Sequence, residues 1–187
     1  RRLRRAIPSD GKSVLEALAP REPEPAPRQA ALFYQRGVAP RYMLRRGFTP
    51  ETLKAWDVGW DQEDEAVVLP LWRGDRLFGL IQRRLKKEPK YYYVGDFKKS
   101  RVLFGLEHVP EDAGSVMLVE GPIDAMWAWQ CGYPAVASLG ASLSGEQADM
   151  LARRFTGVVI AYDADKAGRR GAADAAAKLS RVHVAML

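Results

Sequence analysis

The stretch "VVIAYDADKAGRRG", residues 158–171, runs from an apolar segment directly into Asp163 and Asp165 and then into glycine and arginine. Two carboxylates about 4 Å apart, at an effective dielectric constant near 20, repel each other by roughly 4 kcal/mol. Either a cation therefore lies beside these aspartates, or at least one of them points into water. The partner of this acidic pair decides what the chain does.

A second acidic turn lies about 40 residues earlier, in "SVMLVEGPID", residues 115–124. Glu120 ends an apolar run, Gly121 suits a sharp bend, and Asp124 falls in the first turn of the next predicted helix. A carboxylate is favourable at that place because the amino end of a helix carries partial positive charge. Both acidic turns thus join a predicted strand to a predicted helix.

The segments after residue 114 alternate between the two kinds of structure. Strands are predicted at 115–120, 134–140, 157–163 and 182–187, and helices at 122–132, 144–155 and 167–179, where Ser144 and Gln147 have the spacing of a capping box. This alternation predicts an α/β fold with a parallel sheet, right-handed crossovers and helices on both faces. The carboxyl ends of parallel strands share one edge, so Glu120, Asp163 and Asp165 are expected to converge.

Such a group of carboxylates, with no histidine or cysteine nearby, suits Mg²⁺ or Mn²⁺. We expect Glu120, Asp163 and Asp165 to hold this metal ion, in a site able to support phosphoryl or nucleotidyl transfer. The alternative is that these acids merely cap the helices that follow them.

The net charge of +6 over 187 residues is concentrated in one window, from Gln82 to Arg101. Only Glu88 and Asp96 oppose its eight basic residues, which are Arg83, Arg84, Lys86, Lys87, Lys90, Lys98, Lys99 and Arg101. This excess predicts a partner that carries phosphates. A solvated basic hairpin is the alternative.

Three regions are predicted along the chain. Residues 1–27 end in the proline-rich "APREPEPAP" and are expected to form a tail or linker. Residues 28–113 are expected to form a basic α+β subdomain, and residues 114–187 the α/β subdomain. Within the first subdomain, helices are predicted at 28–37, at 40–47 and after Thr49 as N-cap, and strands at 66–72 and 76–85.

Several classes of protein are disfavoured. No apolar run of about 18 residues predicts a membrane span, and no secretory signal follows the basic start. The single Cys131 excludes an internal disulfide and a cysteine zinc site, and His108 and His183 are interpreted as structural. The expected location is the cytoplasm. Because position 1 is Arg, a fragment or a processed chain is expected.

The segments "LVEGPIDAMWAWQCGYPAVASLGASL" and "VVIAYDADKAGRRGA" resemble the TOPRIM fold of bacterial-type primases, topoisomerases and some nucleases, and most closely its primase branch. The segments "YMLRRGFTPETLKAWDVGW", "LFGLIQRRL", "PKYYY" and "FKKSRVLFGL" resemble the amino-terminal half of a primase RNA-polymerase core. The resemblance covers about residues 28–187.

This resemblance implies a role for each matching residue. It implies metal-binding and catalytic roles for Glu120, Asp163 and Asp165, with Asp124 as a supporting acid. It also implies that a group of basic residues holds template or nucleotide, namely Arg83, Lys90, Lys99 and Arg101. Lys166, just after the aspartates, is also expected to reach phosphates.

The implied function is DNA-templated synthesis of short RNA primers from nucleoside triphosphates on single-stranded DNA. A replicative helicase is a further implied partner, through regions outside this chain. The alternatives are a TOPRIM nuclease using the same acids and a non-catalytic module that binds single strands. A topoisomerase is disfavoured because no active-site tyrosine is evident.

The chain departs from the family in three respects. It has no amino-terminal zinc-binding domain, it stops at Leu187 before a further acidic motif, and Tyr92, Tyr93 and Val94 replace a polar stretch. We therefore expect an excised or minimal polymerase core.

Overall fold

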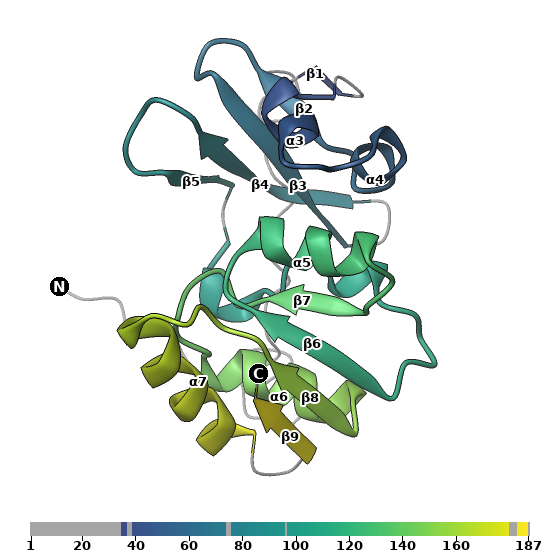
Figure 1. Ribbon diagram of the computed structural model, residues 1–187, viewed down its shortest axis with the longest axis vertical. Helices are drawn as coiled ribbons and strands as arrows, with labels where there is room; N and C mark the ends of the chain where they lie inside the picture. The colour runs from purple at the N-terminus through teal and green to yellow at the C-terminus, as the bar shows by residue number, and fades with distance from the viewer. Residues whose placement is uncertain (1–34, 37–38, 74–75, 96, 180–182, 187) are drawn as a thin grey trace, which may run out of the picture.

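The computed structural model describes residues 35–36, 39–73, 76–95, 97–179 and 183–186, which form two sheets stacked one above the other (Figure 1). The first sheet is antiparallel and has the order β1-β2-β3-β4-β5. Its strands are β1 (Gln35–Arg36), β2 (Gly59–Asp61), β3 (Ala66–Arg73), β4 (Arg76–Arg84) and β5 (Tyr91–Val94). The predicted tail, residues 1–27, lies outside the described residues.

Two short helices accompany this sheet, α3 (Arg41–Arg45) and α4 (Pro50–Ala55). The predicted N-cap of α4 is confirmed, because the Thr49 hydroxyl accepts a hydrogen bond from the Thr52 N–H at 3.2 Å. The predicted helix 28–37 is wrong at Gln35–Arg36, which pair as a strand with β2; its first residues, 28–34, lie outside the described part of the chain. Strand pairing across the sheet has overridden the local helical pattern there.

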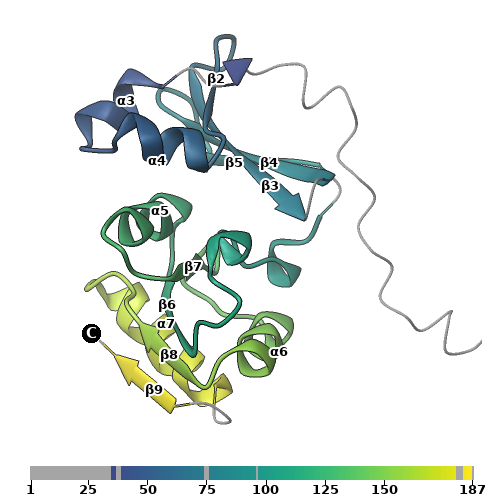
Figure 2. The same cartoon turned by 90° about the vertical axis from the view of Figure 1, so that its right-hand side faces the viewer.

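The second sheet confirms the predicted α/β class. It is parallel with the order β7-β6-β8-β9, formed by β6 (Ser115–Val119), β7 (Ala135–Ala137), β8 (Gly157–Ile160) and β9 (His183–Met186). The connecting helices are α5 (Pro122–Gln130), α6 (Gly145–Arg154) and α7 (Lys166–Lys178). Helix α5 covers one face, and α6 and α7 cover the other (Figures 1 and 2).

One hydrophobic cluster joins the two sheets. It includes Leu69 and Ile81 from the first sheet and Val119, Ile123 and Met126 from the second sheet and α5. The connecting segment contains the 3₁₀ turns η1 (Lys99–Arg101) and η2 (Leu106–His108), and Phe104 between them pairs with Ala137 of β7. The boundary at residues 113/114 stays a prediction, because this core runs across it.

The carboxyl end of α5 also binds the turn between α3 and α4. The Gln130 side chain donates to the Gly47 carbonyl at 3.1 Å and accepts from the Thr49 N–H at 2.9 Å. Trp127 packs edge-on against Phe48, with ring centroids 5.2 Å apart. These contacts fix the position of α3 and α4 relative to α5 and the parallel sheet.

The described residues contain no helix that combines the length and the apolar character needed to cross a bilayer. His108 stacks on Trp56 with ring centroids 3.9 Å apart, which agrees with its predicted structural role.

Helix α7 packs closely on the loop after β7 through Gly171. A Cβ atom at that position would lie 1.9 Å from the carbonyl oxygen of Ala141. Only glycine lets the helix approach the backbone this closely.

We expect Gly171→Ala to lower the free energy of unfolding by about 1–3 kcal/mol, because the new methyl group forces the helix away from Ala141. Gly145→Ala at the start of α6 is the matched control, since its Cβ would meet no atom within 4 Å. That control should be neutral or stabilising by about 0.4–1 kcal/mol. Urea unfolding measures both, and equal effects would contradict the packing argument.

Candidate nucleic-acid and metal site

The pairing of β6 with β8 brings two of the predicted acids together. Leu118 lies opposite Ile160 in the sheet, so both strands end at the same edge. The Asp163 backbone N–H donates to the Glu120 carboxylate at 3.1 Å. Two residues 43 positions apart in sequence are thus in direct contact, as their strand ends predicted.

Two of the four acids, Glu120 and Asp124, have raised pKa values. The pKa of Glu120 is raised, first by burial and then by the like charges of Asp163, Asp165 and Asp124. The pKa of Asp124 is also raised, by loss of hydration and by the charge of Asp163, while Arg46 opposes this rise. A cation bound here would relieve this repulsion.

Asp165 serves the helix that follows it. Its Oδ1 accepts from the Gly168 N–H at 2.7 Å and so caps α7. The alternative interpretation, that the acids cap the helices that follow them, is therefore correct for Asp165, which also lies close enough to Glu120 to raise its pKa. Gly168 leaves room for them, because a Cβ there would lie 2.0 Å from the Asp163 carbonyl oxygen and 2.7 Å from Glu120 Oε1.

Within the described ranges, no group of three or more acidic, histidine or cysteine side chains is already arranged around a metal position. The chemistry of the residues nevertheless fits Mg²⁺. Asp124, Asp163 and Asp165 are exposed to solvent, Glu120 is half-buried, and all offer the carboxylate oxygens that this ion prefers.

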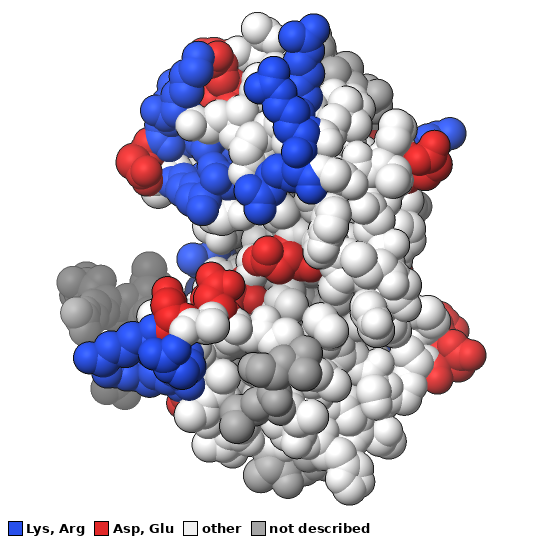
Figure 3. Space-filling view, viewed as in Figure 1, with Lys and Arg blue, Asp and Glu red and all other residues white. Residues whose placement is uncertain are grey.

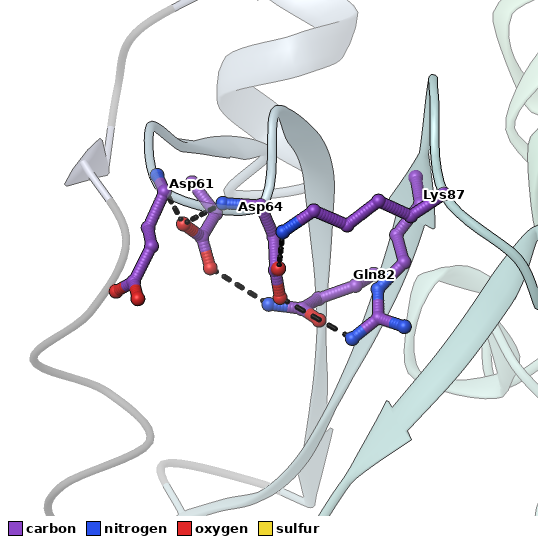
Figure 4. Close-up of polar contacts among 6 residues, drawn as sticks. Asp61, Asp64, Gln82 and Lys87 are labelled. Carbon is purple, nitrogen blue, oxygen red and sulfur yellow. Dashed lines mark hydrogen bonds and ion pairs between the residues drawn. The ribbon is translucent and has the colours of Figure 1, made fainter.

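Part of the basic window is neutralised inside the first sheet. Asp64, in the turn between β2 and β3, pairs with Lys87 at 2.7 Å and with Arg84 at 3.3 Å, while the neighbouring Asp61 accepts from Gln82 at 2.7 Å (Figure 4). The partner of Lys86 is Glu65, at 2.8 Å. These three cations are less available to a phosphate than the sequence predicted.

The predicted binding residues Arg83, Lys90 and Lys99 form no ion pair with any other described residue. Arg83 lies over the rings of Tyr42 and Tyr91, at 5.5 and 5.4 Å from their centroids. Lys99 lies 4.7 Å from the Tyr93 centroid, and Lys90 is exposed near Tyr91.

The two other predicted basic residues lie on the α/β side. Arg101 in η1 approaches Glu146 at 3.5 Å, between side chains that are both more than half exposed. Lys166 is exposed at the first position of α7, directly after the aspartates.

The sequence did not predict the part played by α3. The Tyr42 hydroxyl accepts hydrogen bonds from Arg46 and Arg83, both at 3.3 Å, and the charge of Arg46 lowers the pKa of Asp124 in α5. Burial raises the pKa of Tyr91 to about 12, so the ring that packs against Arg83 is neutral. The one feature of the sequence that could have indicated this role of α3 is the pair of arginines, Arg45 and Arg46, at the end of a predicted helix before Gly47.

A pocket of about 620 Å³ extends this basic surface. Its lining combines arginines with aromatic and apolar residues, namely Ala39, Pro40, Arg41, Tyr42, Arg45, Arg46, Trp60 and Leu85. Figure 3 shows basic side chains gathered over the first sheet and acidic side chains directly below them, at the indentation between the sheets. A basic surface thus faces an acidic edge.

Comparisons with known proteins agree with this arrangement. Residues 117–187 match a family model described as Toprim-like. The DNA primase of Aquifex aeolicus (strain VF5) is 30% identical to this chain, in a match that covers 71% of this chain and 36% of that protein. The chain thus spans about a third of the length of this relative.

Solved structures give the same result. The Aquifex aeolicus primase fragment with zinc-binding and RNA polymerase domains superimposes with a TM-score of 0.68 and 28% identity, over 78% of this chain and 48% of that one. The primase fragment of the bacteriophage T7 primase-helicase protein has a TM-score of 0.63 and 25% identity, over 77% of this chain and 64% of that one.

We expect Asp163→Asn to lower the pKa of Glu120, because it removes one of the negative charges that raise this pKa. The backbone hydrogen bond from residue 163, which lowers this pKa, is kept, and burial, the largest cause of the rise, is unchanged, so the shift reports the lost charge. Titration of the Glu120 carboxyl carbon by NMR measures the shift. Asp149→Asn, on the exposed side of α6, is the control, and an equal shift there would contradict the proximity of the acids.

Proposed function

We propose that this chain, a relative of the bacterial-type DNA primases that contain a Toprim domain, is a primase catalytic core that makes short RNA primers on single-stranded DNA. One observation carries the proposal: Glu120 contacts Asp163 at a sheet edge where the charge of Arg46 acts on the neighbouring Asp124. Acids beside a basic surface are what nucleotidyl transfer on a phosphate-rich substrate requires.

Glu120, Asp163 and Asp165 are the residues that would hold Mg²⁺ or Mn²⁺, with Asp124 as a supporting acid. When bound, such an ion neutralises phosphate charge and activates oxygen nucleophiles. Glu120 either completes the metal site or accepts the proton of the attacking 3′-hydroxyl. The raised pKa of Glu120 suits the role of proton acceptor, because a carboxylate with a higher pKa binds a proton more readily.

The template strand would contact the cations of the first sheet and of η1. Arg83, Lys90 and Lys99 would bind its phosphates or those of a nucleoside triphosphate, with Arg101 and Lys166 as flanking contacts. Among the tyrosines of β5, only Tyr92 is available for base stacking, since it is 44% exposed while Tyr91 and Tyr93 pack against the core. Arg84 lies 4.1 Å from the Tyr92 centroid and already occupies one face of that ring.

The T7 relative is a fragment of a primase-helicase protein, which supports a replicative helicase as a partner of the whole protein. We place the activity in the cytoplasm, with the nucleoside triphosphates. A Toprim nuclease is the second candidate, because the same acids suit metal-assisted hydrolysis.

We expect Asp163→Asn to abolish nucleotidyl transfer while binding of single-stranded DNA falls less than about threefold, since the lost group contacts metal rather than template. The assay incubates the protein with labelled single-stranded DNA, Mg²⁺ and nucleoside triphosphates. New extension products support the primase, and shortened DNA supports the nuclease. Primer synthesis at the unmodified rate by the variant would overturn the site assignment.

We expect Lys99→Ala to weaken binding of all single-stranded templates and to reduce the slope of log K against log salt by roughly 0.7, the value for one lost phosphate contact. Lys86→Ala is the control, because this lysine already pairs with Glu65. Fluorescence anisotropy between 50 and 200 mM salt, roughly the range over which such contacts weaken, measures both slopes. An unchanged slope for Lys99→Ala removes that residue from the interface.

A further inference from the structure

The segment Lys99–Val102, which carries two of the predicted phosphate-binding cations, is held from the start of α6. The side-chain amide nitrogen of Gln147 lies within hydrogen-bond distance of three carbonyl oxygens, those of Lys99 at 3.0 Å, Val102 at 2.7 Å and Ser138 at 2.9 Å, so one of its two N–H groups is shared between acceptors. Gln147 is 1% exposed, so these contacts are shielded from water.

The capping box of α6 supplies further contacts to the same segment. The box itself is the predicted one, with Ser144 Oγ accepting from the Gln147 N–H and Gln147 Oε1 accepting from the Ser144 N–H. In addition, the Ser144 hydroxyl donates to the Ser100 carbonyl. Glu146, in the first turn of α6, lies 3.5 Å from Arg101.

These extra contacts are more than a helix cap requires. A capping box uses the serine oxygen and the glutamine Oε1, and it leaves the glutamine amide nitrogen free. Here that nitrogen donates only to residues outside α6. Buried carbonyl groups need donors, and without Gln147 the buried carbonyl of Val102 would lose one. The more exposed carbonyls of Lys99 and Ser100 would lose the contacts that tie them to α6.

The same amide nitrogen connects the segment to the acidic edge. Ser138, one of its acceptors, donates through its backbone N–H to the Val119 carbonyl at 3.0 Å, and Val119 precedes Glu120 in the chain. The Gly140 N–H, two residues further on, donates to the Glu120 carbonyl at 3.1 Å. A short series of hydrogen bonds therefore runs from the backbone of Lys99 to the backbone of Glu120.

We propose that Ser144 and Gln147 are positioning residues for nucleic-acid binding, which hold the Lys99–Val102 segment so that Lys99 meets a phosphate of a single strand at a fixed distance from Glu120. This inference rests on the proposed function, because it assigns the two residues a role through Lys99. In this proposal the cap of α6 affects the binding of nucleic acid by holding Lys99 in place, and it does not itself contact the ligand.

A double-mutant cycle on single-strand affinity tests the inference. Gln147→Leu should weaken binding of a labelled oligothymidylate by roughly two- to tenfold in the otherwise unchanged chain. In a Lys99→Ala background the same change should have less than about a twofold effect, because the contact it positions is already lost. In a Lys90→Ala background its full effect should remain, since neither Ser144 nor Gln147 contacts Lys90.

A milder pair of variants keeps the test informative if Gln147→Leu does not fold. Ser144→Gly keeps a competent N-cap but removes the hydroxyl that reaches Ser100, so binding should again weaken only when Lys99 is present. Ser144→Thr keeps that hydroxyl and should leave affinity unchanged. Circular dichroism confirms that each variant is folded before its affinity is measured.

The outcomes separate the two proposals. An equal loss of affinity with and without Lys99, or no loss for Ser144→Gly in the unchanged chain, overturns the positioning role. Failure of the unmodified chain to bind the oligonucleotide, or no effect of Lys99→Ala, counts instead against the proposed function.

Discussion

The parallel pairing of β6 with β8 is the constraint on which the site depends. It places Glu120 beside Asp163, and repulsion between their carboxylates works against that arrangement. The backbone N–H of Asp163 offsets part of the repulsion by donating to Glu120. The absence of a side chain at Gly168 removes a clash with both residues, so backbone geometry rather than side-chain packing keeps the acids together.

Helix α5 connects the acidic edge of the parallel sheet to the amino-terminal part of the structure. Its first turn contributes Asp124 to the acidic edge, and its last residue, Gln130, binds the turn that follows α3. Arg46 directly precedes that turn and acts on Asp124. A single rigid helix of nine residues therefore sets the position of the basic surface of the first sheet relative to the acids of the second.

Local patterns predicted the alternation of strands and helices after residue 114, the caps of α4 and α6 and the meeting of Glu120 with Asp163. Each of these depends on short-range periodicity or on the rule that parallel strands end at one edge. The predicted helix at Gln35–Arg36 was wrong because pairing with β2 lies outside any local window. The neutralisation of Arg84 and Lys87 by Asp64 was missed for the same reason, since counting charges along a sequence does not identify partners about 20 residues away.

Two glutamines at opposite ends of their helices play comparable roles, Gln130 at the end of α5 and Gln147 in the first turn of α6. The side chains of Gln130 and Gln147 each extend from a helix that covers the parallel sheet and bind the backbone of a segment outside that helix. The segment bound by Gln130 follows Arg46, and the segment bound by Gln147 contains Lys99. An amide side chain can donate and accept at once, so it satisfies backbone groups of both kinds without adding charge. A charged residue at either position would change the electrostatic potential between the acids and the cations. A neutral amide holds the segment in place without adding charge.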